Sequence, residues 1–110
     1  MALDTGDIAS SMLGAMKQVL SKYWHVVSSY AESESKKTAE TLATIEQELI
    51  TKQIDQVQAS ALLDIQKHAT RTVLLTVEGI GLVAAETAIN SAFGAIRTLV
   101  NDAVGFNLIG

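Results

Sequence analysis

The chain has 110 residues, of which 48% are hydrophobic and only 5% aromatic, and it contains neither proline nor cysteine. This length suits one domain, residues 1–110, and the lack of alternating apolar and polar runs leaves all-α as the class that fits. The absence of cysteine excludes disulfides and thiolate metal sites. The formal charge of −4, with no cluster of Lys and Arg, argues against a nucleic-acid binder.

The N-terminus is acidic and has no basic stretch followed by an apolar core, so the sequence predicts no secretory signal. Asp4 is the expected N-cap of a first helix, with Leu3 and Ile8 placed to form a hydrophobic staple. From there apolar residues recur at steps of three and four, the pattern of an amphipathic helix. We predict one helix over about 5–51. The alternative is a break near Ser33, in a stretch rich in Ser and Glu.

A short break near the centre of the chain is the clearest local signal. Asp55, followed three residues later by Gln58, has the spacing of a capping box, in which each side chain accepts from the other residue's backbone N–H. A second helix is therefore predicted to begin at Gln56 and to run to about Val104. Gly105 is well placed as the left-handed residue that ends it.

Folding at this break predicts a long antiparallel hairpin with arms over about 5–51 and 56–104. Its tip is charged and its base, which contains both termini, is apolar. Gly79 and Gly81 fall inside the second arm, where each costs roughly 1 kcal/mol relative to Ala and either weakens the helix or lets a neighbour approach closely.

A hairpin of two helices leaves much apolar surface wet, so we expect self-association into a larger helical bundle, with coiled-coil-like packing. The expected close interface is a stripe of small residues on the second arm: Gly81, Ala84, Ala88, Ser91 and Ala95. A polar line on the same arm either faces solvent or pairs between chains and fixes their register: Glu86, Asn90, Arg97 and Asn101. The alternative is a compact monomer that packs both faces inside a three- or four-helix bundle.

Candidate chemical sites are few. Asp64 and His68 share a helix face, but the chain offers no third metal ligand, so a solvated pair is the better interpretation. His25 is expected to approach Glu78 in the hairpin as a buried or half-buried structural pair. The sequence has no nucleophile–base motif, phosphate loop or di-iron motif, so we expect no enzyme activity, no cofactor and no metal.

The apolar stretch from Thr72 to Leu108 raises a membrane alternative, because a spanning helix needs roughly 20 apolar residues. Charged residues interrupt every candidate window of this stretch: Glu78, Glu86, Arg97 and Asp102. A pore- or holin-like hairpin therefore requires an oligomer that hides those charges.

Four segments of the second arm, Leu62–Lys67, Leu74–Gly81, Ala88–Asn90 and Val104–Phe106, resemble small uncharacterised helical proteins encoded in tailed phages and prophages. The resemblance covers the C-terminal half of the chain. It implies a virion or assembly component and carries no site residues.

Together these observations predict a non-enzymatic structural or assembly protein. Its partner is a second copy of itself, with another protein as a candidate partner at the charged tip between Glu46 and Asp64. We expect a cytoplasmic protein, or a virion-associated one if it is phage-derived. The rival functions are a membrane-active hairpin and a small helical adaptor that binds another protein.

Overall fold

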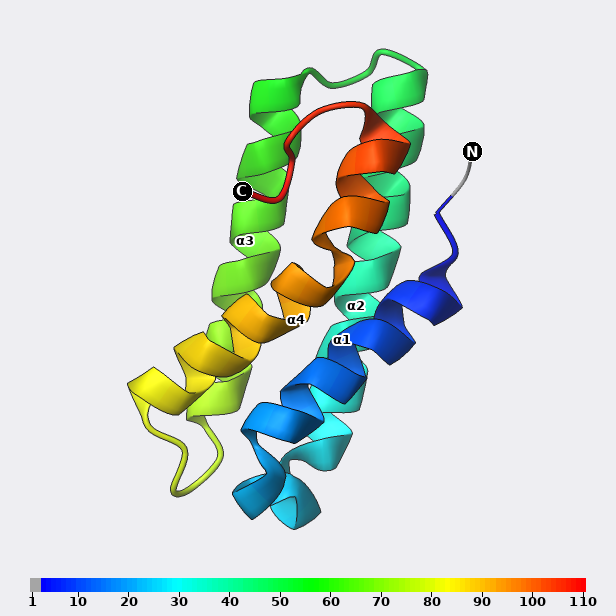
Figure 1. The fold of residues 1–110 in the computed structure, drawn as a ribbon. Coiled ribbons are helices and arrows are strands. Elements are labelled where there is room, and N and C mark those ends of the chain that lie inside the picture. Colours follow the sequence, from blue (N-terminus) through cyan, green and yellow to red (C-terminus); the bar gives the residue numbers. More distant parts are fainter. Residues whose placement is uncertain (1–2) are drawn as a thin grey trace.

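The computed structural model describes residues 3–110 and contains four α-helices (Figure 1). They are α1 (Thr5–Val19), α2 (Trp24–Ile50), α3 (Gln56–Leu75) and α4 (Leu82–Val104), and a 3₁₀ turn, Ser21–Tyr23, joins α1 to α2. Residues 3–110 contain no β-strand. The prediction of an all-α chain is confirmed.

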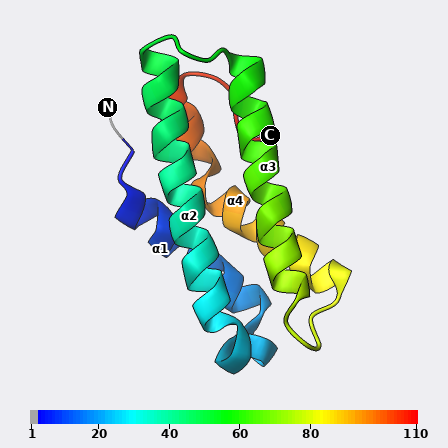
Figure 2. The ribbon, with the colours of Figure 1, turned by 180° about the vertical axis from the view of Figure 1, so that it is seen from behind.

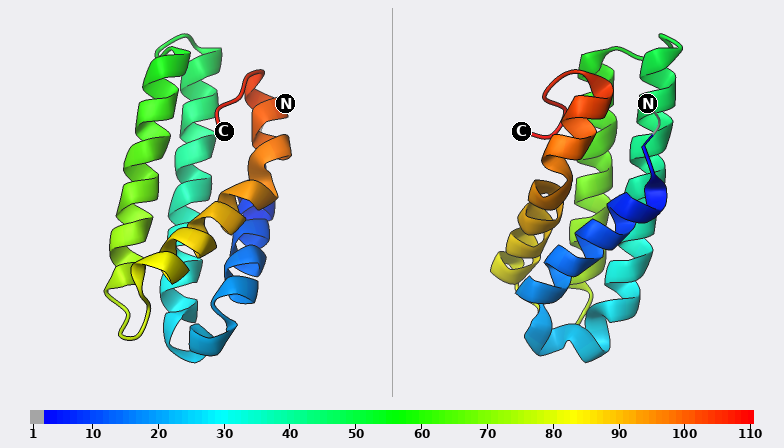
Figure 3. Two further views of the ribbon diagram at one scale, coloured as in Figure 1. Left: turned by 60° about the vertical axis from the view of Figure 1, so that its left-hand side comes forward. Right: turned by 45° about the vertical axis from the view of Figure 1, so that its right-hand side comes forward.

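The helices form two layers. α2 and α3 lie side by side as an antiparallel hairpin, and α1 and α4 pack together across one face of it (Figures 2 and 3). Each helix contacts the next along the chain, and α4 returns to α1, so the four close into a bundle. The bundle measures 42 × 22 × 19 Å.

Helical periodicity explains how the core forms. α1 buries Ile8, Met12 and Met16 at steps of four, and all three are fully inaccessible to solvent. The buried face of α4 faces the same core and alternates small and large side chains: Ala85, Ala88, Ile89, Ala92, Phe93, Ile96 and Val100. The core is therefore completed by side chains of a single chain.

The predicted helix ends around the central break are confirmed. Gln58 N donates to Asp55 Oδ1 at 2.8 Å, and Asp55 N donates to Gln58 Oε1 at 2.9 Å, which is the capping box. At the far end of α4, Gly105 has φ 83°, and its N–H donates to the carbonyl of Asn101 at 2.9 Å. This single bond with a left-handed glycine is the αL form of helix termination.

The prediction of a continuous first helix over 5–51 is wrong, because the chain turns at residues 20–23. Leu20 leaves helical geometry, with φ −102° and ψ 22°, yet it is fully buried. Ser33, the alternative break point, lies within continuous α2. The turn contains neither Gly nor Pro, so no residue in it forces the helix to end. The chain turns here because the apolar face of α1 can then be buried against α2 and α4.

The prediction of a continuous second helix over 56–104 is wrong as well. The chain leaves α3 at Thr76 and re-enters a helix after Gly81. Gly79 adopts φ 92°, a conformation that costs any other residue strain. A Cβ on Gly79 would lie 3.4 Å from Cε1 of Tyr23, so the turn before α2 and the turn before α4 meet at the same end of the bundle. The alternative of a compact four-helix bundle is therefore the one that the structure adopts.

Candidate functional site: a groove between α2 and α3

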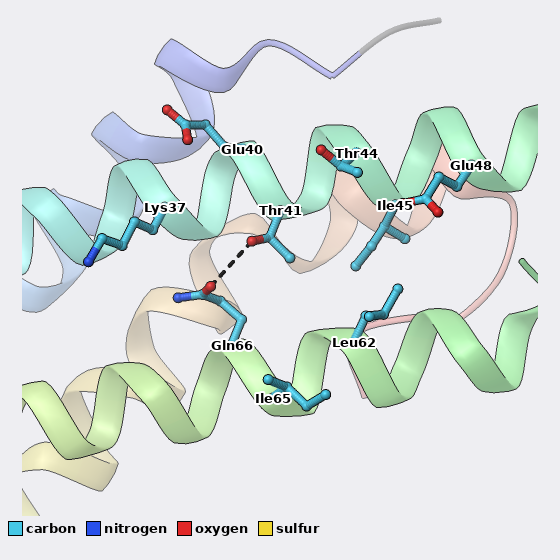
Figure 4. Close-up of a pocket in the computed structure, with 9 residues that line it drawn as sticks. All are labelled: Lys37, Glu40, Thr41, Thr44, Ile45, Glu48, Leu62, Ile65 and Gln66. Carbon is cyan, nitrogen blue, oxygen red and sulfur yellow. Dashed lines mark hydrogen bonds between the residues drawn. The ribbon is translucent and has the colours of Figure 1, made fainter.

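A groove of about 490 Å³ lies between α2 and α3 (Figure 4). Viewed from behind, α2 and α3 stand in front of α1 and α4, so no helix within residues 3–110 covers this face of the hairpin (Figure 2). The groove is lined by nine residues: Lys37, Glu40, Thr41, Thr44, Ile45, Glu48, Leu62, Ile65 and Gln66. On this face, the surfaces of α2 and α3 that point away from α1 and α4 pack against no other helix of residues 3–110.

The apolar part of the groove comes from three side chains. Ile45 of α2 is buried and reaches the core, whereas Leu62 and Ile65 of α3 are 37% and 66% exposed. Figure 4 shows Leu62 projecting towards α2 opposite Ile45, between the two helices. Large aliphatic side chains at this level of exposure are suited to burial against another surface.

A chain of hydrogen bonds crosses from α2 to α3 at one end of the groove. Thr41 Oγ1 donates to Gln66 Oε1 at 3.2 Å, and Gln66 Nε2 donates to Thr70 Oγ1 at 3.4 Å. Thr70 in turn donates to Glu34 Oε1 at 3.1 Å, while Lys37 Nζ donates to Glu34 Oε2 at 3.4 Å. Glu34 is only 2% exposed, so these bonds satisfy a buried carboxylate and fix the register of the two helices.

Sequence reasoning missed this network. The available signal was that Glu34, Thr38 and Thr41 occupy the same side of α2 as its apolar residues, where polar side chains need partners. Glu34 and Thr41 find their partners, Thr70 and Gln66, on α3, whereas Thr38 Oγ1 has no hydrogen-bond partner within residues 3–110. Periodicity alone does not reveal which residues face each other across a hairpin.

The N-terminal segment is held in a similar way. The backbone N–H of Leu3 donates to Glu46 Oε1 at 2.8 Å, and Glu46 is 4% exposed. Glu46 was expected in a charged tip, but the structure uses it to fasten the start of α1 to α2.

The small stripe of α4 is only partly on the surface. Ala88 is fully buried inside the bundle and Ala84 and Ser91 are half-buried, whereas Gly81 and Ala95 are exposed. α1 and α4 make the most extensive contact of any two helices. Ala88 therefore belongs to the bundle's own core.

The polar line of α4 also has contacts within the chain. Glu86 forms an ion pair with Arg71 of α3. Asn101 holds the C-terminal segment: its Nδ2 donates to the carbonyl of Ile109, and its Oδ1 accepts from the N–H of Ile109, both at 2.9 Å. Asn90 and Arg97 are exposed.

The histidines lie outside the groove. His68, which shares a helix face with Asp64, is exposed. Its Nδ1 lies 2.6 Å from Nη1 of Arg71, so the neighbour of this ring nitrogen is a guanidinium. His25 and Glu78 are both exposed, with no hydrogen bond or ion pair between them in the described chain. The predicted structural pair is wrong, because the turn over residues 76–81 replaces the helix that would have brought them together.

The groove therefore combines a short apolar floor with one basic and two acidic side chains at its rim. Over residues 3–110 no three His, Asp or Glu side chains are grouped for metal binding, and no helix is long and apolar enough to cross a bilayer. The groups present can make apolar contacts, hydrogen bonds and ion pairs. No protein-family model, curated protein or solved structure matches this chain.

Proposed function

We propose that this protein is a non-enzymatic assembly module that self-associates. The observation that carries the proposal is the uncovered α2–α3 face, where Leu62 and Ile65 remain exposed beside a groove whose polar groups are suited to docking. Two further exposed apolar residues, Val26 and Tyr30, lie at helical spacing on the same side of α2 as Lys37. In this proposal the face brings copies of the bundle together.

The proposal replaces the surface predicted from sequence. The small stripe of α4 was expected to be the interface, but Ala88 is used inside the bundle and Glu86 is paired with Arg71. The α2–α3 face has no such internal partner helix. A role as a phage-derived structural component, in the cytoplasm or on a virion, is the biological setting that we propose for this assembly.

Light scattering during size exclusion, over a series of protein concentrations, tests the proposal. We expect the mass to rise with concentration to at least twice the 11.7 kDa of the chain. A mass of 11.7 kDa at every concentration would contradict self-association.

The experiment also locates the interface when it includes a variant at another exposed site. Val83, in the first turn of α4, is 80% exposed and lies outside the groove. We expect Val83→Glu to leave the mass unchanged, whereas its loss of assembly would move the interface to the α3–α4 end of the bundle.

A further inference from the structure

The charges along the groove have a self-complementary arrangement. Lys37 and Glu48 both line it from α2, about three helical turns apart, so they project from the same side of the helix. Lys37 marks one end of the groove and Glu48 the other. Figure 4 shows Lys37 and Glu48 at opposite ends of the groove, and Ile65 and Leu62 of α3 lie between these two ends.

The hydrogen bonds between the helices fix where the midpoint of this arrangement falls. Because Thr41 bonds Gln66 and Glu34 bonds Thr70, the midpoint between Lys37 and Glu48 on α2 lies beside residues 62–65 of α3. The two exposed apolar residues of the groove, Leu62 and Ile65, therefore lie at the centre of the charge pattern.

We propose that a second copy of the chain docks on this face around a two-fold axis. The axis lies in the interface and runs across the middle of the groove from α2 to α3, perpendicular to both helices. The proposal rests on the proposed self-association and names its surface and symmetry. The axis brings Lys37 of each copy opposite Glu48 of the other, and it brings Leu62 and Ile65 of the two copies together at the centre.

The charges favour a second copy over an unrelated partner. An isologous interface requires a surface that complements itself after a half-turn, and a basic end, an apolar centre and an acidic end meet this requirement. Lys37 has a 62% exposed side chain whose one bond runs to Glu34, and Glu48 forms no ion pair within residues 3–110. Glu40, the remaining charged residue of the groove, also lines the groove between α1 and α2 and so lies on the outer ridge of α2.

The apolar centre is tested by Ile65→Glu, which places two carboxylates against each other at the axis. We expect loss of the dimer with the bundle still folded, because the side chain is 66% exposed in the single chain. Val57→Glu is the matched control: Val57 is another β-branched residue of α3, is 78% exposed and does not line the groove. This control should dimerise like the unmodified chain.

The symmetry is tested by Lys37→Glu and Glu48→Lys. Each variant alone should dimerise roughly tenfold more weakly, because both of its cross-axis pairs join like charges. An equimolar mixture of the two variants should recover the dimer, since every cross-axis pair then joins opposite charges. Restoration on mixing is expected for an isologous interface and not for a contact elsewhere on the surface.

Two outcomes show whether this proposal fails alone or together with the function on which it rests. An unmodified chain that stays monomeric contradicts both. An unmodified chain that associates, with Ile65→Glu and the charge variants associating equally well, contradicts this interface and leaves self-association standing. Lys37→Glu puts a carboxylate near buried Glu34, so if circular dichroism shows it unfolded, Glu48→Lys and Ile65→Glu decide the matter.

Discussion

Thr70 is fully buried, and its hydroxyl is the link between Gln66 on its own helix and the carboxylate of Glu34 on α2. A buried carboxylate that loses a donor retains its desolvation cost without the compensating bond. The stability of the α2–α3 hairpin should therefore depend on this one hydroxyl more than its size suggests.

We predict that Thr70→Val, which keeps the shape and removes the hydroxyl, lowers the free energy of unfolding by about 1–3 kcal/mol. Thr72→Val is the control, because Thr72 is exposed and bonds only the carbonyl of His68 one turn back. Urea denaturation followed by circular dichroism measures both. Equal effects of the two variants would show that Glu34 does not need Thr70.

Asp55, the N-cap of α3, is the second residue whose contribution to the free energy of unfolding can be predicted. Asp55→Ala removes the acceptor for Gln58 N and should cost about 1 kcal/mol. Asp64→Ala, in the exposed middle of the same helix, removes a carboxylate without a cap and should have a much smaller effect. A silent Asp55→Ala in the same denaturation experiment would mean that the cap does not stabilise α3.

At this scale the sequence predicted what is local and missed what is not. Asp55 and Gln58 were identified because a capping box is defined by spacing along the chain. The bonds from Glu34 to Thr70 and from Leu3 to Glu46 join residues far apart in sequence. Their partners depend on how the helices are placed, which spacing does not determine.

The two turns before α2 and α4 determine the arrangement of the helices. The one before α4 needs Gly79 at φ 92°, whereas Gly94 lies inside α4 with open space where a Cβ would go. The same substitution should therefore have opposite effects at the two positions.

We predict that Gly79→Ala destabilises the bundle by about 1–2 kcal/mol, because Ala is strained at this φ. Gly94→Ala should stabilise it by up to about 1 kcal/mol, since Ala is the better helix former. Thermal unfolding by circular dichroism compares the two. A neutral or stabilising Gly79→Ala would contradict the left-handed turn.

Gly79 and Gly81 did not by themselves predict the turn before α4, because two glycines are also compatible with a weakened continuous helix. The turn before α2 had no such marker: Leu20 and Tyr23 fit the amphipathic pattern of a helix that the structure interrupts. That interruption is favourable because it lets Ile8, Met12 and Met16 pack into the bundle. It is a consequence of tertiary packing that local propensity does not contain.

At the scale of the whole molecule, closing the bundle changes the role of the small residues in α4. Ala88 is fully buried inside the bundle, whereas Ala95 is exposed. Of the five small residues that the sequence singled out, the bundle buries Ala88 fully and Ala84 and Ser91 partly. Whether the partner of these residues was another chain or the chain's own bundle depended on the turn at residues 20–23.

Ala88→Leu should therefore act on the fold of the single chain. Overpacking at this position is expected to lower the free energy of unfolding by about 1–3 kcal/mol. Ala95→Leu adds the same side chain at an exposed position and should change stability little. If Ala88→Leu left stability unchanged, the burial of Ala88 in the core would be wrong.

The central claim is that two copies meet on the uncovered α2–α3 face, and the absence of cysteine allows a direct measurement. Ile65→Cys should form a disulfide across the two-fold axis under mild oxidation, giving twice the chain mass on a non-reducing gel. Val57→Cys, on the same helix but outside the groove, should stay largely at the single-chain mass of 11.7 kDa. No more cross-linked dimer from Ile65→Cys than from Val57→Cys would contradict the claim.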